Sequence, residues 1–284
     1  MRASTETENH LPGSRMKSDK NILVIIPAYN EEDTIGRVIE KTRYYFPLSD
    51  ILVVNDGSTD STSSISKEKG VLVLDLPYNL GIGGAMQTGY KFAYRMGYDI
   101  AVQCDGDGQH HPAQIKRLVD TLVNDGADMV LGSRYLRKKR YKSEVFRKMG
   151  IWIFSRVISV IVRQRLTDPT SGFRAVNRDV IRSFSNLYPG DYPEPEALVL
   201  LHRQGFTIRE IYVNMSSRKG GNSSINAWRS VYYMVKVLLA IFIDLCKHVP
   251  RGREPGKEAK EDAENTNDNR YDECFAVNDC VRAY

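Results

Sequence analysis

The chain has 284 residues, 42% of them hydrophobic, which suffices for a substantial core in one large domain with or without appendages. The formal net charge of +5 is uneven: residues 134–166 contain 11 Lys or Arg and one acid, whereas residues 254–273 contain eight acids and three bases. Because the positive charge is local and no nucleic-acid-binding module is recognisable, these features argue against nucleic acid as a partner.

Short apolar runs alternate with segments of helical periodicity along the first half of the chain. The runs are typical of strands buried on both faces, and they lie at 22–26, 51–54, 71–74, 100–104 and 128–131. Pro27 is expected to end the first strand. Helices are expected near 30–39, after Ser58, and at 80–96 and 112–123. This alternation predicts an α/β fold with a mostly parallel central sheet flanked by helices.

The second half of the chain contains two amphipathic or apolar segments. Tyr141–Arg165 has apolar residues at helical spacing with arginines interleaved, which suits an anionic membrane surface. A core helix with a solvated basic face is the alternative. Val231–Cys246 has 16 residues and includes Lys236 and Asp244, whereas a membrane span needs about 20 apolar residues. We interpret it as an interfacial helix, as a docking helix for a membrane-protein partner, or as a helix packed on the domain's own core.

The four cysteines show no framework spacing, and residues 1–20 lack the apolar stretch of a signal peptide. We therefore expect a reducing, cytoplasmic setting, with the chain peripheral on the cytoplasmic face of the membrane. The expected organisation is a disordered tail at 1–19, the main domain at 20–225, an amphipathic or docking helix at 226–249, and a flexible charged tail at 250–284.

Three polar loops follow the expected strands, at Pro27–Glu31, Asn55–Ser58 and Asp105–Gln109. In parallel α/β sheets, ligands bind beyond the carboxyl ends of the strands, so these loops converge on one crevice. Asp105 and Asp107, flexed by glycines, suit a hard divalent cation that is shared with substrate phosphates. An EF-hand is excluded because its sixth and twelfth positions would be His110 and Lys116. An ordinary turn remains the alternative.

Six motifs occur in one order along the chain. They are Val-Ile-Ile-Pro-Ala-Tyr-Asn-Glu-Glu at 24–32, Val-Val-Asn-Asp-Gly-Ser-Thr-Asp at 53–60, Asn-Leu-Gly at 79–81, Asp-Gly-Asp-Gly-Gln-His at 105–110, Gly-Ser-Arg at 132–134 and Ser-Gly-Phe-Arg at 171–174. Over about residues 22–225 the chain resembles family-2 glycosyltransferases with the GT-A fold, above all the polyprenyl-phosphate sugar synthases such as dolichyl-phosphate mannose synthase. The resemblance implies a nucleotide-sugar donor, Mg²⁺ or Mn²⁺, and inversion at the anomeric carbon.

The resemblance also assigns residues to the nucleotide sugar. It implies that Glu31 lies near the ribose hydroxyls and that Asp56 accepts a hydrogen bond from the base. As alternatives, Glu31 suits the first turn of a helix and Asp56 suits an Asx-type turn. Arg134 is a phosphate or acceptor partner through its planar guanidinium, or an exposed member of the basic run. The implied donor-binding residues are Pro27, Tyr29, Glu31, Asp56, Asp105, Gly106 and Arg134.

For the metal, the resemblance implies direct binding by Asp107, sharing of Asp105 between the ribose and the metal, and an added oxygen ligand from Gln109. The ion would clamp the diphosphate, so that no acid is needed at the leaving group. His110 and His111 are weaker candidates, because a Mg²⁺ or Mn²⁺ diphosphate site prefers oxygen ligands.

An acidic segment precedes the apolar stretch Ala197–Leu201. The resemblance implies that Glu194 or Glu196 acts as a base toward a hydroxyl acceptor, although helix-start acids without chemistry fit the same pattern. A lipid phosphate is already anionic and needs no base. Arg174 and Arg218 would then hold that phosphate.

The leading hypothesis is an inverting glycosyltransferase that moves a sugar from a nucleotide-diphosphate donor to a polyprenyl phosphate at the cytoplasmic membrane surface. The alternatives are a transferase that extends a polysaccharide or glycolipid hydroxyl, and a non-catalytic nucleotide-sugar-binding protein. The intact pair Asp105 and Asp107 argues against the last.

Overall fold

The computed structural model describes residues 20–136, 145–215, 236–243 and 245, with the side chains of 145–151 left aside. A seven-stranded sheet has the order β3-β2-β1-β4-β6-β5-β7. Its strands are β1 (Ile22–Ala28), β2 (Asp50–Asn55), β3 (Leu72–Asp75), β4 (Ile100–Gln103), β5 (Met129–Ser133), β6 (Arg174–Asn177) and β7 (Ile208–Tyr212). β6 is antiparallel to both neighbours and every other pair is parallel, which confirms the predicted mostly parallel sheet.

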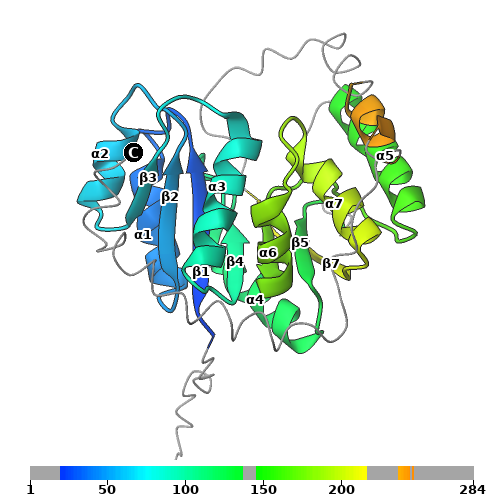
Figure 1. The fold of residues 1–284 in the computed structure, drawn as a ribbon, viewed down its shortest axis with the longest axis horizontal. Coiled ribbons are helices and arrows are strands. Elements are labelled where there is room, and N and C mark those ends of the chain that lie inside the picture. The colour runs from blue at the N-terminus through cyan, green and yellow to red at the C-terminus, as the bar shows by residue number, and fades with distance from the viewer. Residues whose placement is uncertain (1–19, 137–144, 216–235, 244, 246–284) are drawn as a thin grey trace, which may run out of the picture.

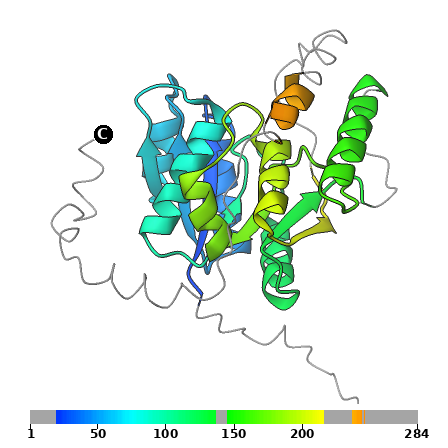
Figure 2. The ribbon, with the colours of Figure 1, turned by 45° about the vertical axis from the view of Figure 1, so that its right-hand side comes forward.

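Helices cover both faces of the sheet (Figures 1 and 2). They are α1 (Ile35–Tyr45), α2 (Thr62–Glu68), α3 (Gly81–Arg95), the 3₁₀ turn η1 (Pro112–Gln114), α4 (Ile115–Asn124), α5 (Val145–Ile161), α6 (Arg178–Asn186) and α7 (Pro193–Gln204). The sheet has a hydrophobic core on each face, and successive side chains of β1 point alternately into one core and the other. Leu23 and Ile25 belong to the core cluster that includes residues of α3, α5, α6 and α7, whereas Val24 and Ile26 belong to the cluster that includes residues of α1 and α4. This alternation explains why the strand is apolar throughout.

Pro27 lies inside β1, which continues to Ala28, so the expectation that it ends the strand is wrong. The Ile25 carbonyl accepts from the Cys104 amide, so Ile25 faces β4, and Pro27, two residues later, faces the same way. β4 ends at Gln103, which pairs with Ile25, so no residue of β4 lies opposite Pro27. The amide that proline lacks therefore costs the sheet no ladder hydrogen bond.

The antiparallel direction of β6 shapes the crevice. Arg174, at the start of β6, lies opposite Gln103, at the end of β4. The segment that leads into β6 therefore reaches the same edge of the sheet as the loops that leave the parallel strands. Neither β6 nor β7 was predicted from the sequence. β6 lies between β4 and β5, and β7 is the edge strand beyond β5.

Residues 236–243 are helical and lie near α5 and α7 (Figures 1 and 2). Val237 and Ile241 are buried in the same core cluster as Phe154 of α5, whereas Leu239 and Phe242 are 55% and 64% exposed. This part of the predicted docking helix thus packs on the domain with one face and leaves another apolar face open. In the described part of the chain, no helix combines the length and apolar character of a membrane span.

Candidate active site

Thr34 connects the loops after β1 and β4. Its hydroxyl oxygen lies 2.9 Å from Glu31 Oε2 and 2.8 Å from the Gly106 carbonyl oxygen. The Glu31 amide donates to Thr62 Oγ1 at 2.8 Å, which adds the start of α2 to the same network. α1, which is fully described, begins at Ile35 and has no acid in its first turn. The Glu31 carbonyl nevertheless accepts from the Thr34 and Ile35 amides at 3.0 and 2.9 Å, so Glu31 lies immediately before α1 and both interpretations of this residue remain open.

Asp56 is buried at the end of β2 and faces the entry of α3. Its Oδ1 accepts from the Leu80 amide at 2.7 Å. The Asx-type hydrogen bond of this loop comes from Asn55, whose Oδ1 accepts from the Ser58 amide at 3.2 Å. Gly57 has φ +69°, and a Cβ there would lie 2.7 Å from the Asn79 nitrogen. The Asn79 segment is therefore pressed against the loop that carries Asp56.

The metal loop presents oxygen donors to the crevice. Asp105 has a side chain that is 34% exposed. Asp107 accepts from the Gln109 backbone amide at 2.9 Å and also bonds the Gln109 side-chain amide. Within the described residues no three His, Cys, Asp or Glu side chains form a metal cage. Carboxylate oxygens with a neighbouring amide are the donors that hold Mg²⁺ or Mn²⁺ jointly with a diphosphate, so the residues present fit such an ion.

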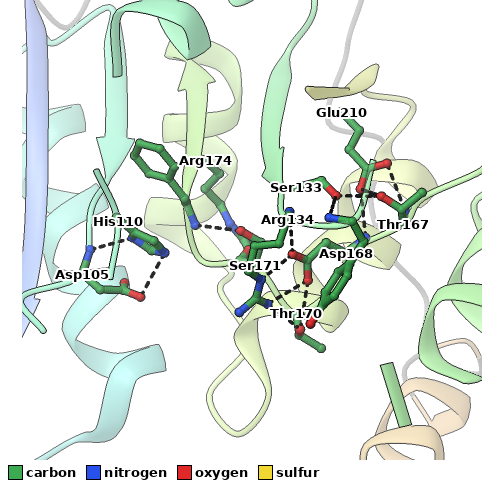
Figure 3. Close-up of polar contacts among 12 residues, drawn as sticks. Asp105, His110, Ser133, Arg134, Thr167, Asp168, Thr170, Ser171, Arg174 and Glu210 are labelled. Atoms are coloured by element: carbon green, nitrogen blue, oxygen red, sulfur yellow. Dashed lines mark hydrogen bonds and ion pairs between the residues drawn. The ribbon is translucent and has the colours of Figure 1, made fainter. Parts of the chain in front are cut away.

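His110 faces Asp105 with both ring nitrogens (Figure 3). Its Nδ1 accepts from the Asp105 amide at 3.0 Å, and its Nε2 lies 3.4 Å from Asp105 Oδ2. The ring is buried and stacks on Phe173, with 4.8 Å between ring centroids. The His111 Nδ1 accepts from the Ala113 amide at 3.3 Å and caps η1. Both histidines therefore have local structural partners.

Arg134 and Asp168 form a buried ion pair beyond the end of β5 (Figure 3). The Arg134 side chain is 9% exposed and that of Asp168 is 0% exposed. This burial argues against an exposed member of the basic run. Asp168 was not singled out from the sequence, since its partner is 34 residues away. The only local signal is its place just before the Ser-Gly-Phe-Arg motif.

Glu210 of β7 supports the segment that contains Asp168. Its carboxylate accepts from the backbone amides of Thr167 and Asp168, each at 2.9 Å to Oε1, and from the Thr167 hydroxyl at 3.0 Å. Burial raises the pKa of Glu210, and the charge of Asp168 adds to that rise, while the amide donors oppose it. The loop that holds Arg134 is thus anchored to an edge strand.

Glu194 and Glu196 lie in the first turn of α7, which begins at Pro193. Burial raises the pKa of Glu194, the Arg174 guanidinium opposes that rise, and the charge of Asp105 reinforces it. Glu194 therefore shares an electrostatic environment with the metal loop. Glu196 is buried at 7% exposure. Helix-start acids and a catalytic base remain alternative interpretations for both.

Arg174 lies fully buried at the start of β6, with 0% exposure. Its Nη2 donates to the Ser171 carbonyl at 2.7 Å. Its predicted contact with acceptor phosphate stays a prediction. Arg218, the other predicted phosphate ligand, lies outside the described residues, as do the two predicted terminal tails. Among the other donor-binding predictions, Tyr29 is 48% exposed after β1.

Residues 23–184, more than half of the chain, match the family described as Glycosyl transferase family 2. The chain belongs to this family. It is 32% identical over 246 residues to a UDP-N-acetylglucosamine–dolichyl-phosphate N-acetylglucosaminyltransferase of Methanococcus voltae, covering 78% of this chain and 97% of the relative. It is 35% identical over 168 residues to an undecaprenyl-phosphate mannosyltransferase of Micrococcus luteus, covering 57% and 68%.

The fold also matches a solved structure. A glucosyl-3-phosphoglycerate synthase of Mycobacterium tuberculosis, in complex with Mn²⁺, UDP and glucosyl-3-phosphoglycerate, superposes with a TM-score of 0.63 at 22% identity. The match covers 85% of this chain and 87% of that one. This family-2 glycosyltransferase therefore has the GT-A fold that the sequence motifs predicted.

Proposed function

We propose that this glycosyltransferase moves a sugar from a nucleotide-diphosphate donor to a polyprenyl phosphate, with inversion at the anomeric carbon. The observation that carries the proposal is the match to a dolichyl-phosphate sugar transferase over 97% of that relative's length. The crevice adds support, because the loops after β1, β2 and β4 are joined by hydrogen bonds around the Asp105 and Asp107 carboxylates.

The donor would lie across the carboxyl ends of β1, β2 and β4. Asp56 is buried, and its Oδ1 accepts from the Leu80 amide. Its carboxylate can accept further hydrogen bonds, and it would accept one from the base. Glu31, held by Thr34, would accept from the ribose hydroxyls. Asp105, Asp107 and Gln109 would hold Mg²⁺ or Mn²⁺ at the diphosphate. When bound, that ion neutralises charge on the departing nucleoside diphosphate.

The acceptor step requires no general base when the acceptor is a phosphate. A phosphate oxygen attacks the anomeric carbon from the face opposite the leaving group, the bond from that carbon to the diphosphate oxygen breaks, and the nucleoside diphosphate departs. The nucleophile is already anionic at neutral pH, so no proton must be removed. Arg134, fixed by Asp168 at the edge of the crevice, would orient the acceptor phosphate through its planar guanidinium.

We infer that catalysis takes place at an anionic membrane surface. On α5, Trp152 is 59% exposed and Val160 is 77% exposed, and on the nearby helix Phe242 is 64% exposed. The Arg156 guanidinium lies over the Trp152 ring, 5.3 Å from its centroid. Exposed apolar side chains beside arginines are what an interfacial helix presents to anionic lipid. Such docking would bring the crevice to a membrane-embedded acceptor.

The test is transfer of labelled sugar from UDP-N-acetylglucosamine, UDP-glucose and GDP-mannose, each with Mn²⁺, to a polyprenyl phosphate. The expected product is acid-labile and extractable into organic solvent, and it forms only when the lipid is present. Transfer to a glycolipid or polysaccharide hydroxyl, with none to the lipid phosphate, would overturn the acceptor assignment. Nucleotide-sugar binding without any transfer would instead favour the non-catalytic alternative.

A further inference from the structure

The approach to β6 forms one wall around the Asp105 carboxylate. Because β6 runs antiparallel to β4, Arg174 pairs in register with Gln103, and Gly172 and Phe173 lie beside the residues that follow Gln103. The predicted role of this segment concerned only the acceptor phosphate, through Arg174. The contacts of Gly172, Phe173 and Arg174 point instead to Asp105.

Gly172 leaves the space that the Asp105 carboxylate occupies. A Cβ at position 172 would lie 2.8 Å from Gln103 Nε2, 3.3 Å from Asp105 Oδ1 and 3.5 Å from Asp105 Oδ2. Gln103 Nε2 in turn lies 3.4 Å from Asp105 Oδ1. A methyl group would therefore displace the amide or the carboxylate, since both occupy the volume beside the glycine.

Phe173 acts on the same carboxylate through His110. The two rings stack with centroids 4.8 Å apart and an interplanar angle of 20°. The His110 Nδ1 accepts a backbone hydrogen bond, so in the neutral ring the proton is on Nε2. That nitrogen lies 3.4 Å from Asp105 Oδ2. The stacked ring thus presents an N–H to one carboxylate oxygen while Gln103 presents an amide to the other (Figure 3 shows the His110 side).

Arg174 supplies a buried positive charge below these groups. Its Nε and Nη1 are buried and have no hydrogen-bond partner among the described residues, and the same holds for Gln103 Oε1 and the Tyr90 hydroxyl. A buried guanidinium is stable only near compensating charge or polar groups. Burial raises the pKa of Glu194, the Arg174 guanidinium opposes that rise and the charge of Asp105 reinforces it, so Arg174, Asp105 and Glu194 lie within one electrostatic environment. The cation offsets carboxylates that must also lie near a diphosphate.

We propose that Gly172, Phe173 and Arg174 are positioning residues that fix the Asp105 carboxylate for the donor and its metal, and that they are not ligands of the acceptor phosphate. The inference deepens the proposed function and rests on it, because Asp105 matters in this way only if the crevice binds a nucleotide-diphosphate donor. Displacing a catalytic group by about 1 Å can cost on the order of 100-fold in rate, so small shifts in this wall have large effects.

The test compares Gly172→Ala with Gly190→Ala. At Gly190 an added Cβ has nothing within 4 Å among the described residues, and its φ is not in the left-handed region. Free Mn²⁺ is followed by electron paramagnetic resonance in the presence of UDP or GDP, whichever the wild-type chain binds. For Gly172→Ala we expect Mn²⁺ affinity in the ternary complex to fall at least about tenfold. The thermal midpoint without ligand should stay near that of Gly190→Ala, and the KM for polyprenyl phosphate should not change.

A second pair of variants keeps the proposal testable if Gly172→Ala folds poorly. Phe173→Leu removes the ring that orients His110, whereas Phe206→Leu removes another buried ring just beyond the end of α7. Only Phe173→Leu should weaken Mn²⁺ binding. Wild-type Mn²⁺ affinity in Gly172→Ala and Phe173→Leu, or a raised acceptor KM as their main defect, overturns the inference. If the wild-type chain binds no Mn²⁺ with either nucleotide, the proposed function itself fails.

Discussion

The Arg134 guanidinium binds the Asp168 carboxylate through two parallel hydrogen bonds, from Nε to Oδ2 at 2.7 Å and from Nη2 to Oδ1 at 2.9 Å. The Arg134 backbone amide donates to the same carboxylate at 3.1 Å. The pair joins the end of β5 to the loop after α5, and Glu210 anchors that loop to β7. An arginine held in this way keeps one orientation, which is what recognition of a phosphate requires.

Asp168→Ala should destabilise the fold and also impair acceptor use. Removing one partner of a buried ion pair leaves an uncompensated charge, which costs about 3–5 kcal/mol of unfolding free energy. Replacing both partners with apolar residues, in Arg134→Met/Asp168→Leu, should recover most of that loss but not the activity. Urea denaturation measures the first effect and the KM for polyprenyl phosphate the second. A double variant that is active, or less stable than Asp168→Ala, would contradict this interpretation.

Asp107→Asn should abolish metal-dependent transfer while leaving the fold intact. The substitution keeps the shape of a side chain in a partly open loop, so the unfolding free energy should change by no more than about 1 kcal/mol. It removes the charge that a divalent ion prefers in an oxygen ligand. Turnover is measured across a Mn²⁺ titration, with the exposed Asp125→Asn at the end of α4 as the matched control. Wild-type turnover in Asp107→Asn would refute the metal role.

Glu194→Gln distinguishes the two acceptor classes. A general base contributes about 10²- to 10⁴-fold to a reaction that removes a proton. A phosphate acceptor needs no such base, so transfer to polyprenyl phosphate should fall by less than about tenfold, below that range. Glu196→Gln serves as the neighbouring comparison in the same helical turn. A loss on the order of 1,000-fold in Glu194→Gln alone, as expected for a lost base, would favour a hydroxyl acceptor.

Glu210 should make stability depend on pH. Its pKa is raised in the folded state, chiefly by burial, so the folded protein holds that proton more tightly than the unfolded chain. This contribution is fully present below the unfolded pKa of about 4.3 and is lost as pH rises through the folded value. Compared with Glu210→Gln, the wild type should therefore lose unfolding free energy as pH increases from about 4 toward neutrality.

Urea titrations at several pH values measure this difference, and the exposed Glu68→Gln of α2 provides the control. In Glu210→Gln the side-chain carbonyl would still accept from the Thr167 and Asp168 amides, so the comparison isolates the charge. If the unfolding free energies of the wild type and Glu210→Gln change in parallel with pH, the Glu210 carboxyl has the same pKa in the folded and unfolded states, and the prediction is wrong.

The five strands in the first half of the chain could be predicted because the sequence pattern of each is local. β1, β2, β3, β4 and β5 are short apolar runs between turn residues, and each pattern is complete within a few positions. β6 has four residues and begins with a buried arginine, and β7, at an edge of the sheet, has two adjacent charged residues, Arg209 and Glu210, in its middle. Their placement depends on pairing with β4 and β5, which lie more than 40 residues away in the chain.

The site shows the same division. Asp105 and Asp107 follow a recognisable strand, so their position in the crevice could be predicted. The residues beside Asp105 could not, because Gly172 lies 67 residues further along the chain and is brought next to Asp105 by the pairing of β6 with β4. His110 was considered only as a metal ligand, since nothing near it in the sequence reveals the Phe173 ring. Contacts of this kind arise from tertiary structure and leave no periodic signal.

Membrane docking should depend on the exposed apolar residues of α5 and the helix at 236–243. Trp152→Ser/Phe242→Ser removes two large side chains that are 59% and 64% exposed, with little effect expected on the core. Inserting one such side chain into lipid contributes about 1.5–3 kcal/mol, so partitioning should fall at least about tenfold. Flotation with phosphatidylglycerol-containing vesicles measures it, with Tyr44→Ser, 78% exposed on α1, as the control. Equal flotation of the double variant and the wild type would rule out this surface as the docking site.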